Sequence, residues 1–388
     1  MTPVLIAGAG IGGLTTALTL HARGFDALVL ERAHDLQPLG VGINLLPHAV
    51  RELTALGLGE QLTAMAVAPS SIRFYTHRGE LLFTEPRGLS AGDAYPQLSV
   101  HRGRLQMMLL DAVRERPGAD AVRTGSGVTG FRQHDDGIVA ETTAGPVAGA
   151  ALIGADGINS IVRGELHPGP DPLLSSGITM YRGASGITPF LDGHTMAIVK
   201  AGNGVDLITY PIGGGQVNWV LQVPAGQPGP LRGNAKWNAP ATADHVLPHV
   251  TDWNLDWLDM DALIGQSPAL FSYPMVDKDP LPRWGAGRVT LLGDAAHVQV
   301  VQQVLEECLG IMRSGRRIGT QDVAARLRAT LGPLAERPLD VRRHPPEPLH
   351  LPVLRDQRRV AGLGNIYAAE ALHRARIDPR KPLTAADI

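Results

Sequence analysis

The sequence predicts an α/β protein: a dinucleotide-binding fold, an antiparallel β-sheet domain and a small all-α C-terminal segment. Three observations lead to this expectation. A glycine-rich turn joins an apolar run to an amphipathic run at the N-terminus, two further apolar runs end in aspartate, and short alternating segments follow in mid-chain. The expected domains are residues 1–175 with 270–297, residues 176–269, and residues 298–388.

Size and composition narrow the class of protein. A chain of 388 residues suits two or three domains. The only cysteine, Cys308, rules out an internal disulfide and a zinc ribbon, and it fits a reducing compartment. The N-terminus lacks a basic stretch with a cleavage site, and no apolar run reaches the roughly 18 residues that span a bilayer. We therefore expect a cytoplasmic protein.

The first 31 residues read as strand, tight turn, helix and strand. Gly8 permits the turn, Gly10 lets the backbone approach a diphosphate, and Gly13 lets the helix pack closely on the strand. Glu31, at the end of the second strand, is suited to accept hydrogen bonds from a ribose diol. This pattern predicts a dinucleotide site. The alternative is a glycine-rich turn kept for packing, and the motif alone does not distinguish FAD from NAD(H).

Two later segments repeat the layout of a buried strand that ends in a polar turn. The segment "GADGINSIVR" places Asp156 and Gly157 at a strand end, and "GRVTLLGDAAH" does the same with Gly293 and Asp294. Ligands of open α/β sheets bind outside the carboxyl ends of the strands. Both turns are therefore expected in one crevice with the first glycine turn.

A helix predicted after "SVH" adds two polar side chains. Arg102 and Gln106 are four residues apart and share a helix face, so they are suited to reach a phosphate.

Together these motifs resemble the FAD-dependent aromatic hydroxylases of the p-hydroxybenzoate hydroxylase fold, and most closely the branch that modifies phenazines. The resemblance covers about residues 1–297 and includes "GVGINLLPHAV", "AYPQLSVHRGRLQ", "GITMYRG", "YPMVDKDPLPRWG" and "LLGDAAH". It implies that the glycine turn and Glu31 hold the ADP half of FAD, that Arg102 contacts its phosphates, and that Asp294 binds the ribitol. Asp156 and Gly157 are linked in the family to both FAD and NAD(P)H.

The resemblance also implies a reaction. NAD(P)H would reduce the flavin, and dioxygen would add to give a flavin hydroperoxide that hydroxylates a phenazine- or salicylate-like ring, with no catalytic side chain required. Strands between residues 177 and 223 would roof the substrate. The candidate pocket residues share this roof or the strand after it: Met180, Arg182, Tyr210, Trp219 and Met275. The alternative for each is an ordinary core position.

The chain departs from the family pattern after His297. The expected proline and glycine-rich turn, whose backbone N–H groups meet the flavin ring in the family, is replaced by "VQVVQQVLEECLGIMRSGRR", so impaired flavin binding and activity are expected. The net charge changes from acidic to basic at the same point. Residues 352–382 resemble the helix-two-turns-helix of the formamidopyrimidine-DNA glycosylases, in which Gly364, Asn365 and Arg355 would meet DNA phosphates. The alternative to an aromatic hydroxylase is therefore a chimera or rearranged chain that binds DNA weakly and lacks glycosylase activity.

Overall fold

The computed structural model describes residues 2–231 and 239–297. The chain divides into two compact units. The larger comprises Met1–Val276 and Gly285–Ala295, and the smaller contributes residues 277–284, 296 and 297 to the described part. Among the described helices, none combines the length and the apolar character needed to cross a bilayer. The helices and strands belong to the larger unit, except that the last residue of strand β18, Asp277, falls in the smaller one.

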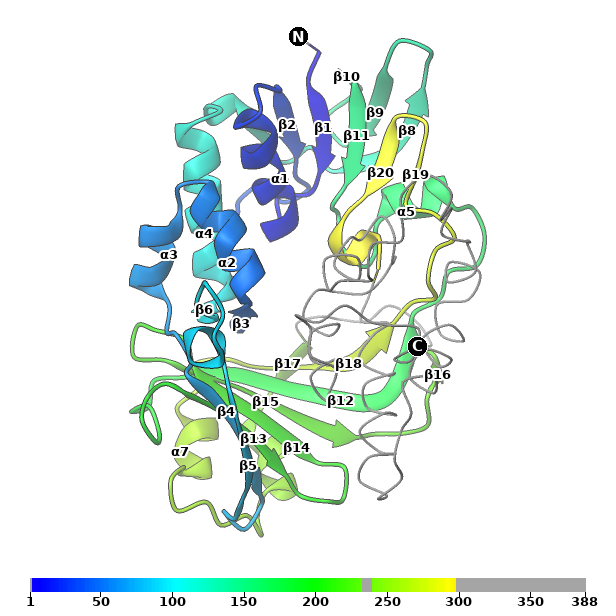
Figure 1. The fold of residues 1–388 in the computed structure, drawn as a ribbon. Helices are drawn as coiled ribbons and strands as arrows, with labels where there is room; N and C mark the ends of the chain where they lie inside the picture. Colours follow the sequence, from blue (N-terminus) through cyan, green and yellow to red (C-terminus); the bar gives the residue numbers. More distant parts are fainter. Residues whose placement is uncertain (1, 232–238, 298–388) are drawn as a thin grey trace, which may run out of the picture. The chain divides into compact units, whose positions relative to one another are not determined.

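A six-stranded sheet carries the N-terminal glycine turn (Figure 1). Its order is β19-β20-β11-β1-β2-β7, and all strands run parallel except the edge strand β19. Strand sequences such as VLIA and ALVL are apolar throughout because both faces of a parallel sheet are buried. The strands are β1 (Val4–Ala7), β2 (Ala27–Leu30), β7 (Val122–Arg123), β11 (Ala151–Gly154), β19 (Gly285–Ala286) and β20 (Val289–Leu291).

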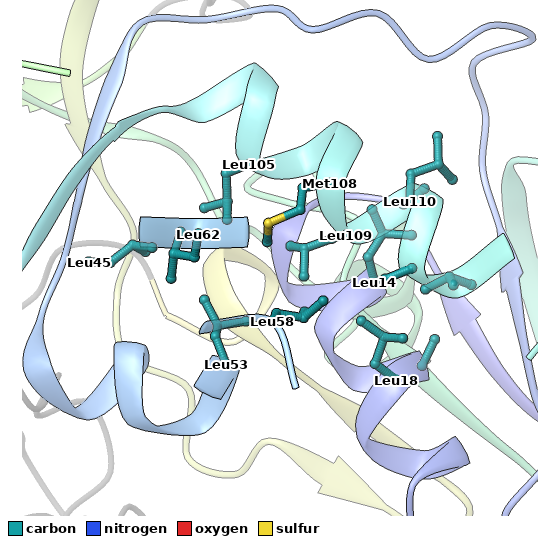
Figure 2. Packing of buried hydrophobic residues seen from close by; sticks show 14 of the residues in the cluster. Leu14, Leu18, Leu45, Leu53, Leu58, Leu62, Leu105, Met108, Leu109 and Leu110 are labelled. Atoms are coloured by element: carbon teal, nitrogen blue, oxygen red, sulfur yellow. The ribbon is translucent and has the colours of Figure 1, made fainter. Parts of the chain in front are cut away.

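Four helices form the main apolar core beside this sheet. They are α1 (Ile11–His21), α2 (Pro47–Ala55), α3 (Gly59–Met65) and α4 (Arg102–Glu115). Along α4, Leu105, Met108, Leu109 and Ala112 recur at helical spacing and are buried. Figure 2 shows Leu105, Met108 and Leu109 among leucines of the other three helices, Leu14, Leu18, Leu53 and Leu62. A two-stranded ribbon, β3 (Gly42–Leu45) with β6 (Leu98–His101), leads into α4.

A smaller layer covers the other face of the sheet. It contains α5 (Ile161–Leu166) and an antiparallel sheet of β8 (Val128–Gln133), β9 (Ile138–Thr142) and β10 (Val147–Gly149). Leu5 points toward this layer, because side chains alternate along β1 and Ile6 belongs to the helical core. A Cβ atom on Gly149 would lie 2.4 Å from Leu5 Cγ, so only glycine allows this approach.

The second large sheet has nine strands. Eight follow the order β17-β18-β12-β15-β14-β13-β4-β5, and β16 pairs with β12. Their bounds are β4 (Ser71–Thr76), β5 (Leu81–Pro86), β12 (Leu174–Ser185), β13 (Thr195–Lys200), β14 (Asp206–Pro211), β15 (Val217–Pro224), β16 (Gly229–Pro230), β17 (Ala239–Ala241) and β18 (Leu270–Asp277). Strand β4 pairs in parallel with β13. Antiparallel pairing joins β12 to β15 and β16, β14 to β13 and β15, β17 to β18, and β4 to β5.

The two faces of this sheet differ in character. One face carries a second apolar core, which includes Val199, Leu207, Trp219 and Leu263 and is covered in part by α6 (Ala243–Val246) and α7 (Met260–Gly265). The opposite face carries Arg182, Tyr210 and Asn218 among apolar side chains, and it meets the β3–β6 ribbon through the bond from Gly42 to Asn218. This second face is called the ribbon face below.

The predicted α/β class and the antiparallel sheet between residues 177 and 223 are confirmed. The sheet also extends beyond the expected 176–269 region, because it takes in β4, β5 and β18. Pairing between such distant strands depends on tertiary packing that local periodicity does not encode. The expected helical segment 298–388 lies outside the described residues.

Replacing Leu109 by alanine should test the helical core. Leu109 is fully buried, so Leu109→Ala is expected to lower the free energy of unfolding by about 2–5 kcal/mol in urea titrations. Leu82→Ala is the matched control, because Leu82 is 53% exposed on β5 and should cost within about 0.5 kcal/mol. Equal losses for the two variants would contradict the described core.

Candidate active site

The glycine turn between β1 and α1 is shaped by steric necessity. Gly8 has a φ of 97°, and a Cβ atom there would lie 2.6 Å from the carbonyl oxygen of Ala155. A Cβ atom on Gly13 would lie 2.0 Å from the oxygen of Gly8. At Gly10, by contrast, a Cβ atom would have no heavy atom within 4 Å. The turn is therefore closed on its protein side and open beside Gly10, at the N-terminus of α1.

Glu31 is fixed against this turn. One carboxylate oxygen accepts a hydrogen bond from the backbone N–H of Ala9 at 2.7 Å, and the other accepts from Ala33 at 2.8 Å. Each oxygen keeps a further lone pair for a ligand hydroxyl. The carboxylate therefore has a set position and a set direction.

Helix α4 touches the same turn from the other side. The Gln106 side-chain amide donates to the oxygen of Ala9 at 2.9 Å, so Gln106 braces the turn. Arg102, in the first turn of the helix, has an exposed side chain, while its backbone N–H donates to Val41. Two residues further along, Arg104 donates to Gln216 at 3.1 Å. The start of α4 thus links the dinucleotide turn to the second sheet.

Asp156 lies at the expected strand end, but its carboxylate is hydrogen-bonded to the loop and helix that follow it. Its carboxylate accepts from the N–H groups of Ile161 at 2.9 Å and Val162 at 3.3 Å, and also from the Ser160 hydroxyl. These bonds cap the start of α5. Gly157, next to it, has a φ of 80° and open space where a side chain would stand.

The third turn follows β20. Gly293 has a φ of 61°, and Asp294 is exposed and accepts no hydrogen bond from any residue of the described ranges 2–231 and 239–297. The buried guanidinium of Arg163 joins this turn to the previous one. It donates to the oxygen of Ala295 at 3.3 Å and forms a two-pronged ion pair with Asp171 at 2.8 and 2.9 Å.

The three turns gather at one edge of the parallel sheet. Ala7 is level with Gly154, and Gly154 is level with Leu291, so all three strands end together. Figure 1 shows η4 (Gly293–Ala295) and the start of α1 at this end of the sheet. A Cβ atom on Gly12 would lie 3.5 Å from Leu292. The three turns therefore lie at one edge of the sheet, the arrangement that the sequence predicts.

The ribbon face of the second sheet collects most of the predicted pocket residues. Strand alternation puts Met180 and Arg182 of β12 on the same face as Tyr210 of β14, and Tyr273 with Met275 of β18 joins them. The guanidinium carbon of Arg182 lies 4.2 Å from the centre of the Tyr273 ring, a cation–π contact.

Charge is concentrated around this contact. Burial lowers the pKa of the Arg182 guanidinium; the Tyr273 hydroxyl counteracts this, and the positive charge of Arg102 adds to it. Burial raises the pKa of Tyr273, which the charge of Arg182 opposes. Burial also raises the pKa of Tyr210. Arg102 is thus close enough to act on the ribbon face, while Gln106 of the same helix touches the glycine turn.

Trp219 is the exception among the expected pocket residues. It is fully buried in the core on the opposite face, and its indole N–H lies 3.1 Å from the Ser185 hydroxyl and 2.9 Å from that of Ser267. Its neighbour Asn218 points to the ribbon face instead. Sequence reasoning also missed Tyr273, although its place two residues before Met275 on one strand was a usable signal.

Comparison with known proteins identifies the chain. A family model described as an FAD binding domain matches residues 1–303, and phenazine 1,6-dicarboxylic acid hydroxylase PhzS from Lysobacter antibioticus is 48% identical over 312 residues, 76% of each chain. The chain belongs to the FAD-dependent aromatic hydroxylases. 3-Hydroxybenzoate 6-hydroxylase 1 from Aquipseudomonas alcaligenes, another relative, is 34% identical over 76% of this chain and 74% of its own.

Solved structures of FAD-dependent enzymes share the fold. Klebsiella pneumoniae HpxO complexed with FAD and uric acid superposes with a TM-score of 0.63 at 23% identity, covering 97% of this chain and 93% of its own. A salicylate hydroxylase substrate complex gives a TM-score of 0.60 at 22% identity, covering 76% and 73%. The predicted membership of the hydroxylase family is thereby confirmed.

The predicted glycosylase-like segment has no such support. The family model ends at residue 303, and Arg355, Gly364 and Asn365 lie outside the described residues. The chimera and the DNA-binding alternative find no support among these relatives.

Two alanine substitutions should distinguish Gly13, which has no room for a side chain, from Gly10, which has open space beside it. Gly13→Ala forces a Cβ atom against the backbone of Gly8, so the melting temperature of the FAD-free protein should fall by several degrees. Gly10→Ala meets no atom and keeps a φ of −70°, so its melting temperature should match that of the wild type. Equal melting temperatures for both variants would show that the turn is not closed as described.

The free energy of unfolding should depend on pH through His101, which caps the start of α4. Its Nδ1 accepts from the N–H groups of Gly103 and Arg104 at the helix start, and burial, followed by the charge of Arg104, lowers its pKa. A lowered folded-state pKa means that the unfolded state takes up the proton first as the pH falls. Stability from this cap should be complete above the unfolded value of about 6.5 and decline below it.

His101→Asn is the variant that tests this, because asparagine keeps a capping oxygen and does not titrate. The difference in unfolding free energy between wild type and variant should change in favour of the variant as the pH falls from 7.5 to about 5. A difference independent of pH would contradict the capping role.

Proposed function

We propose that this protein hydroxylates an aromatic carboxylate with a fused, phenazine-like ring system, using FAD and NAD(P)H with dioxygen as co-substrates. The observation that carries the proposal is the start of α4. It touches the dinucleotide turn through Gln106 and acts electrostatically on Arg182 and Tyr273 through Arg102. One short segment thus connects a cofactor crevice with a cationic, aromatic surface.

The residues at the crevice fit the ADP part of FAD. The open space beside Gly10 and the N–H groups at the start of α1 suit a diphosphate, and the fixed carboxylate of Glu31 suits a ribose diol. The exposed guanidinium of Arg102 would neutralise phosphate charge, and Asp294 would accept from the ribitol hydroxyls. Gln106 would act indirectly, since its amide already holds the turn.

The second turn has a shaping role in this proposal. The Oδ2 atom of Asp156 caps α5, and its Oδ1 atom accepts from the Ser160 hydroxyl, so Asp156 would order the loop and not contact FAD itself. The open face of Gly157 would let the cofactor or the nicotinamide approach the backbone. Gly293 serves the same purpose beside Asp294.

The substrate would lie on the ribbon face. Arg182 offers a positive charge that burial makes costly, and an anionic carboxylate would offset this cost. Tyr273 orients the guanidinium, while Met180, Tyr210 and Met275 supply apolar and aromatic walls. Trp219 plays no direct part because it faces the opposite core.

The chemistry of oxygen transfer belongs to FAD, which takes a hydride from NAD(P)H and activates dioxygen when it is bound. The chain's own residues hold the ring in place, keep bulk water from the ribbon face and balance the carboxylate charge. We assign the reaction to the cytoplasm, because a lone Cys308 suits a reducing compartment.

Two experiments test the proposal: flavin absorbance and turnover of the purified protein, and the KM of variants at Arg182. The protein should show flavin absorbance that NAD(P)H bleaches, and phenazine-1-carboxylate should stimulate NAD(P)H oxidation and gain one oxygen atom by mass spectrometry. Arg182→Met should raise KM for this carboxylate about 10- to 100-fold, because charged hydrogen bonds contribute roughly 1.5–3 kcal/mol. Arg182→Lys should recover part of the loss.

Two controls make the result specific. Phenazine-1-carboxamide lacks the negative charge, so its KM should respond much less to Arg182→Met. Arg132→Ala removes a guanidinium that is 67% exposed on the small sheet, and it should leave both values unchanged. A colourless protein that binds no added FAD, or an unaltered KM in Arg182→Met, would refute the proposal.

A further inference from the structure

The two ends of the nine-stranded sheet differ in how well they are protected against pairing. At one end, β17 is three residues long and has Pro240 at its centre, which makes it a poor pairing edge. At the other end, β5 has six residues, and no strand of residues 2–231 and 239–297 pairs with its outer side (Figure 1). The β5 edge is therefore the end of the sheet to which a further strand can be added.

The exposed side chains at this edge are mostly apolar. Leu81, Leu82 and Phe83 are 55%, 53% and 44% exposed, and Leu89, which follows the strand, is 62% exposed. The Phe83 ring stacks on that of Phe74 in β4, with 4.1 Å between the ring centres and 16° between the planes, so its position is fixed. Contiguous exposed apolar residues on a folded protein are typical of an interaction surface.

The backbone and the charges of β5 also allow another strand to pair. Arg87, in extended conformation just after the strand, donates its N–H inward to the oxygen of Ser70. Because N–H groups alternate in direction along an extended chain, the N–H of Thr84 points outward. Glu85 forms an ion pair with Arg87 at 2.8 Å, so its charge is already balanced within the same chain.

A second copy of this chain fits the β5 edge. In antiparallel pairing about a two-fold axis at Phe83, Thr84 lies opposite Leu82 of the other copy, and Phe83 lies opposite its own equivalent. The two Phe83 rings then extend the stack that begins at Phe74 across the axis. The apolar residues of each copy are thus covered by those of the other.

Exposed charges beside the strand are complementary in the same register. Arg78 lies five residues before Phe83 and therefore comes near Gly88 of the other copy, which lies five residues after it. The N–H of Asp93 donates to the oxygen of Gly88 at 3.1 Å, so Asp93 is next to that position. The side chains of Arg78 and Asp93 are exposed and bond no residue in the described part of the chain. One Arg78–Asp93 contact can therefore form on each side of the axis.

We infer that β5 is a homodimer interface, in which the β5 strands of two copies pair across a two-fold axis at Phe83 and join the two large sheets. The inference is independent of the proposed function. A single strand edge buries less than the roughly 800 Å² per partner of a standard stable interface. The dimer is therefore expected to be reversible, with a dissociation constant of about 1–100 µM. Association stops at two copies, because the β17 edge is short and carries a proline.

Sedimentation velocity of the purified full-length protein, from about 1 to 200 µM, tests this interface. The wild type should change from monomer to dimer over this range. Phe83→Lys puts like charges opposite each other on the axis, so it should weaken association about 30-fold or more. Phe25→Lys is the matched control, because Phe25 is 54% exposed beyond α1, away from β5, and it should leave association unchanged.

A charge exchange tests the register. Arg78→Asp brings two carboxylates together at each contact, and Asp93→Arg brings two guanidinium groups together. Each single variant should weaken association about three- to tenfold at low salt, and the double variant should restore it. Both positions are exposed, so the variants should fold, and far-UV circular dichroism checks this.

Each other outcome is decisive. A wild type that stays monomeric over the whole range overturns the inference, and so does a series of oligomers larger than the dimer. A dimer that folded Phe83→Lys leaves unchanged places the interface elsewhere and also overturns it. If Phe83→Lys does not fold, the charge exchange decides alone: single variants with wild-type association overturn the inference. None of these results bears on flavin binding or turnover, which test the proposed function separately.

Discussion

The parallel register of β1, β11 and β20 is the constraint on which the site depends. Because these strands end level with one another, the three turns that follow them leave the sheet at the same edge. The steric fit of Gly8 against the carbonyl of Ala155 then fixes the first turn relative to the second. Arg163 fixes the second relative to the third through the oxygen of Ala295. The meeting of the three turns at one edge thus follows from strand alignment, and single side chains fix the turns relative to one another.

A second set of contacts joins this edge to the large sheet. Arg104 bonds Gln216, and the Gly42 N–H bonds Asn218, so α4 and the β3–β6 ribbon are both tied to the large sheet. Gln106 in turn ties α4 to the glycine turn at Ala9. Each such bond contributes only about 1 kcal/mol to stability. Their effect is directional, because hydrogen bonds to the backbone fix positions that apolar packing alone would leave free to slide.

Sequence reasoning succeeded where local sterics decide the structure. The glycine spacing predicts the turn because Gly8 and Gly13 have no room for a Cβ atom, and this depends on a few neighbouring residues. Sequence reasoning was less informative where strand register decides which face of a sheet a side chain occupies. Trp219 and Asn218 are adjacent in the chain, and only the pairing of β15 reveals which one faces the β3–β6 ribbon. Asp156 was placed at the correct strand end, but its capping of α5 depends on where the next helix starts.

The parallel pairing of β4 with β13 has a consequence for how the chain assembles. Ser71 lies beside Thr195, so the partner of β4 leaves the ribosome 124 residues later. Until then the β4–β5 hairpin lacks its β13 partner. Its outer strand carries Leu81, Leu82 and Phe83, which are exposed even in the folded protein. Late long-range pairing of this kind slows folding and lengthens the interval in which nascent chains associate wrongly. Production of this protein is therefore expected to benefit from abundant chaperones.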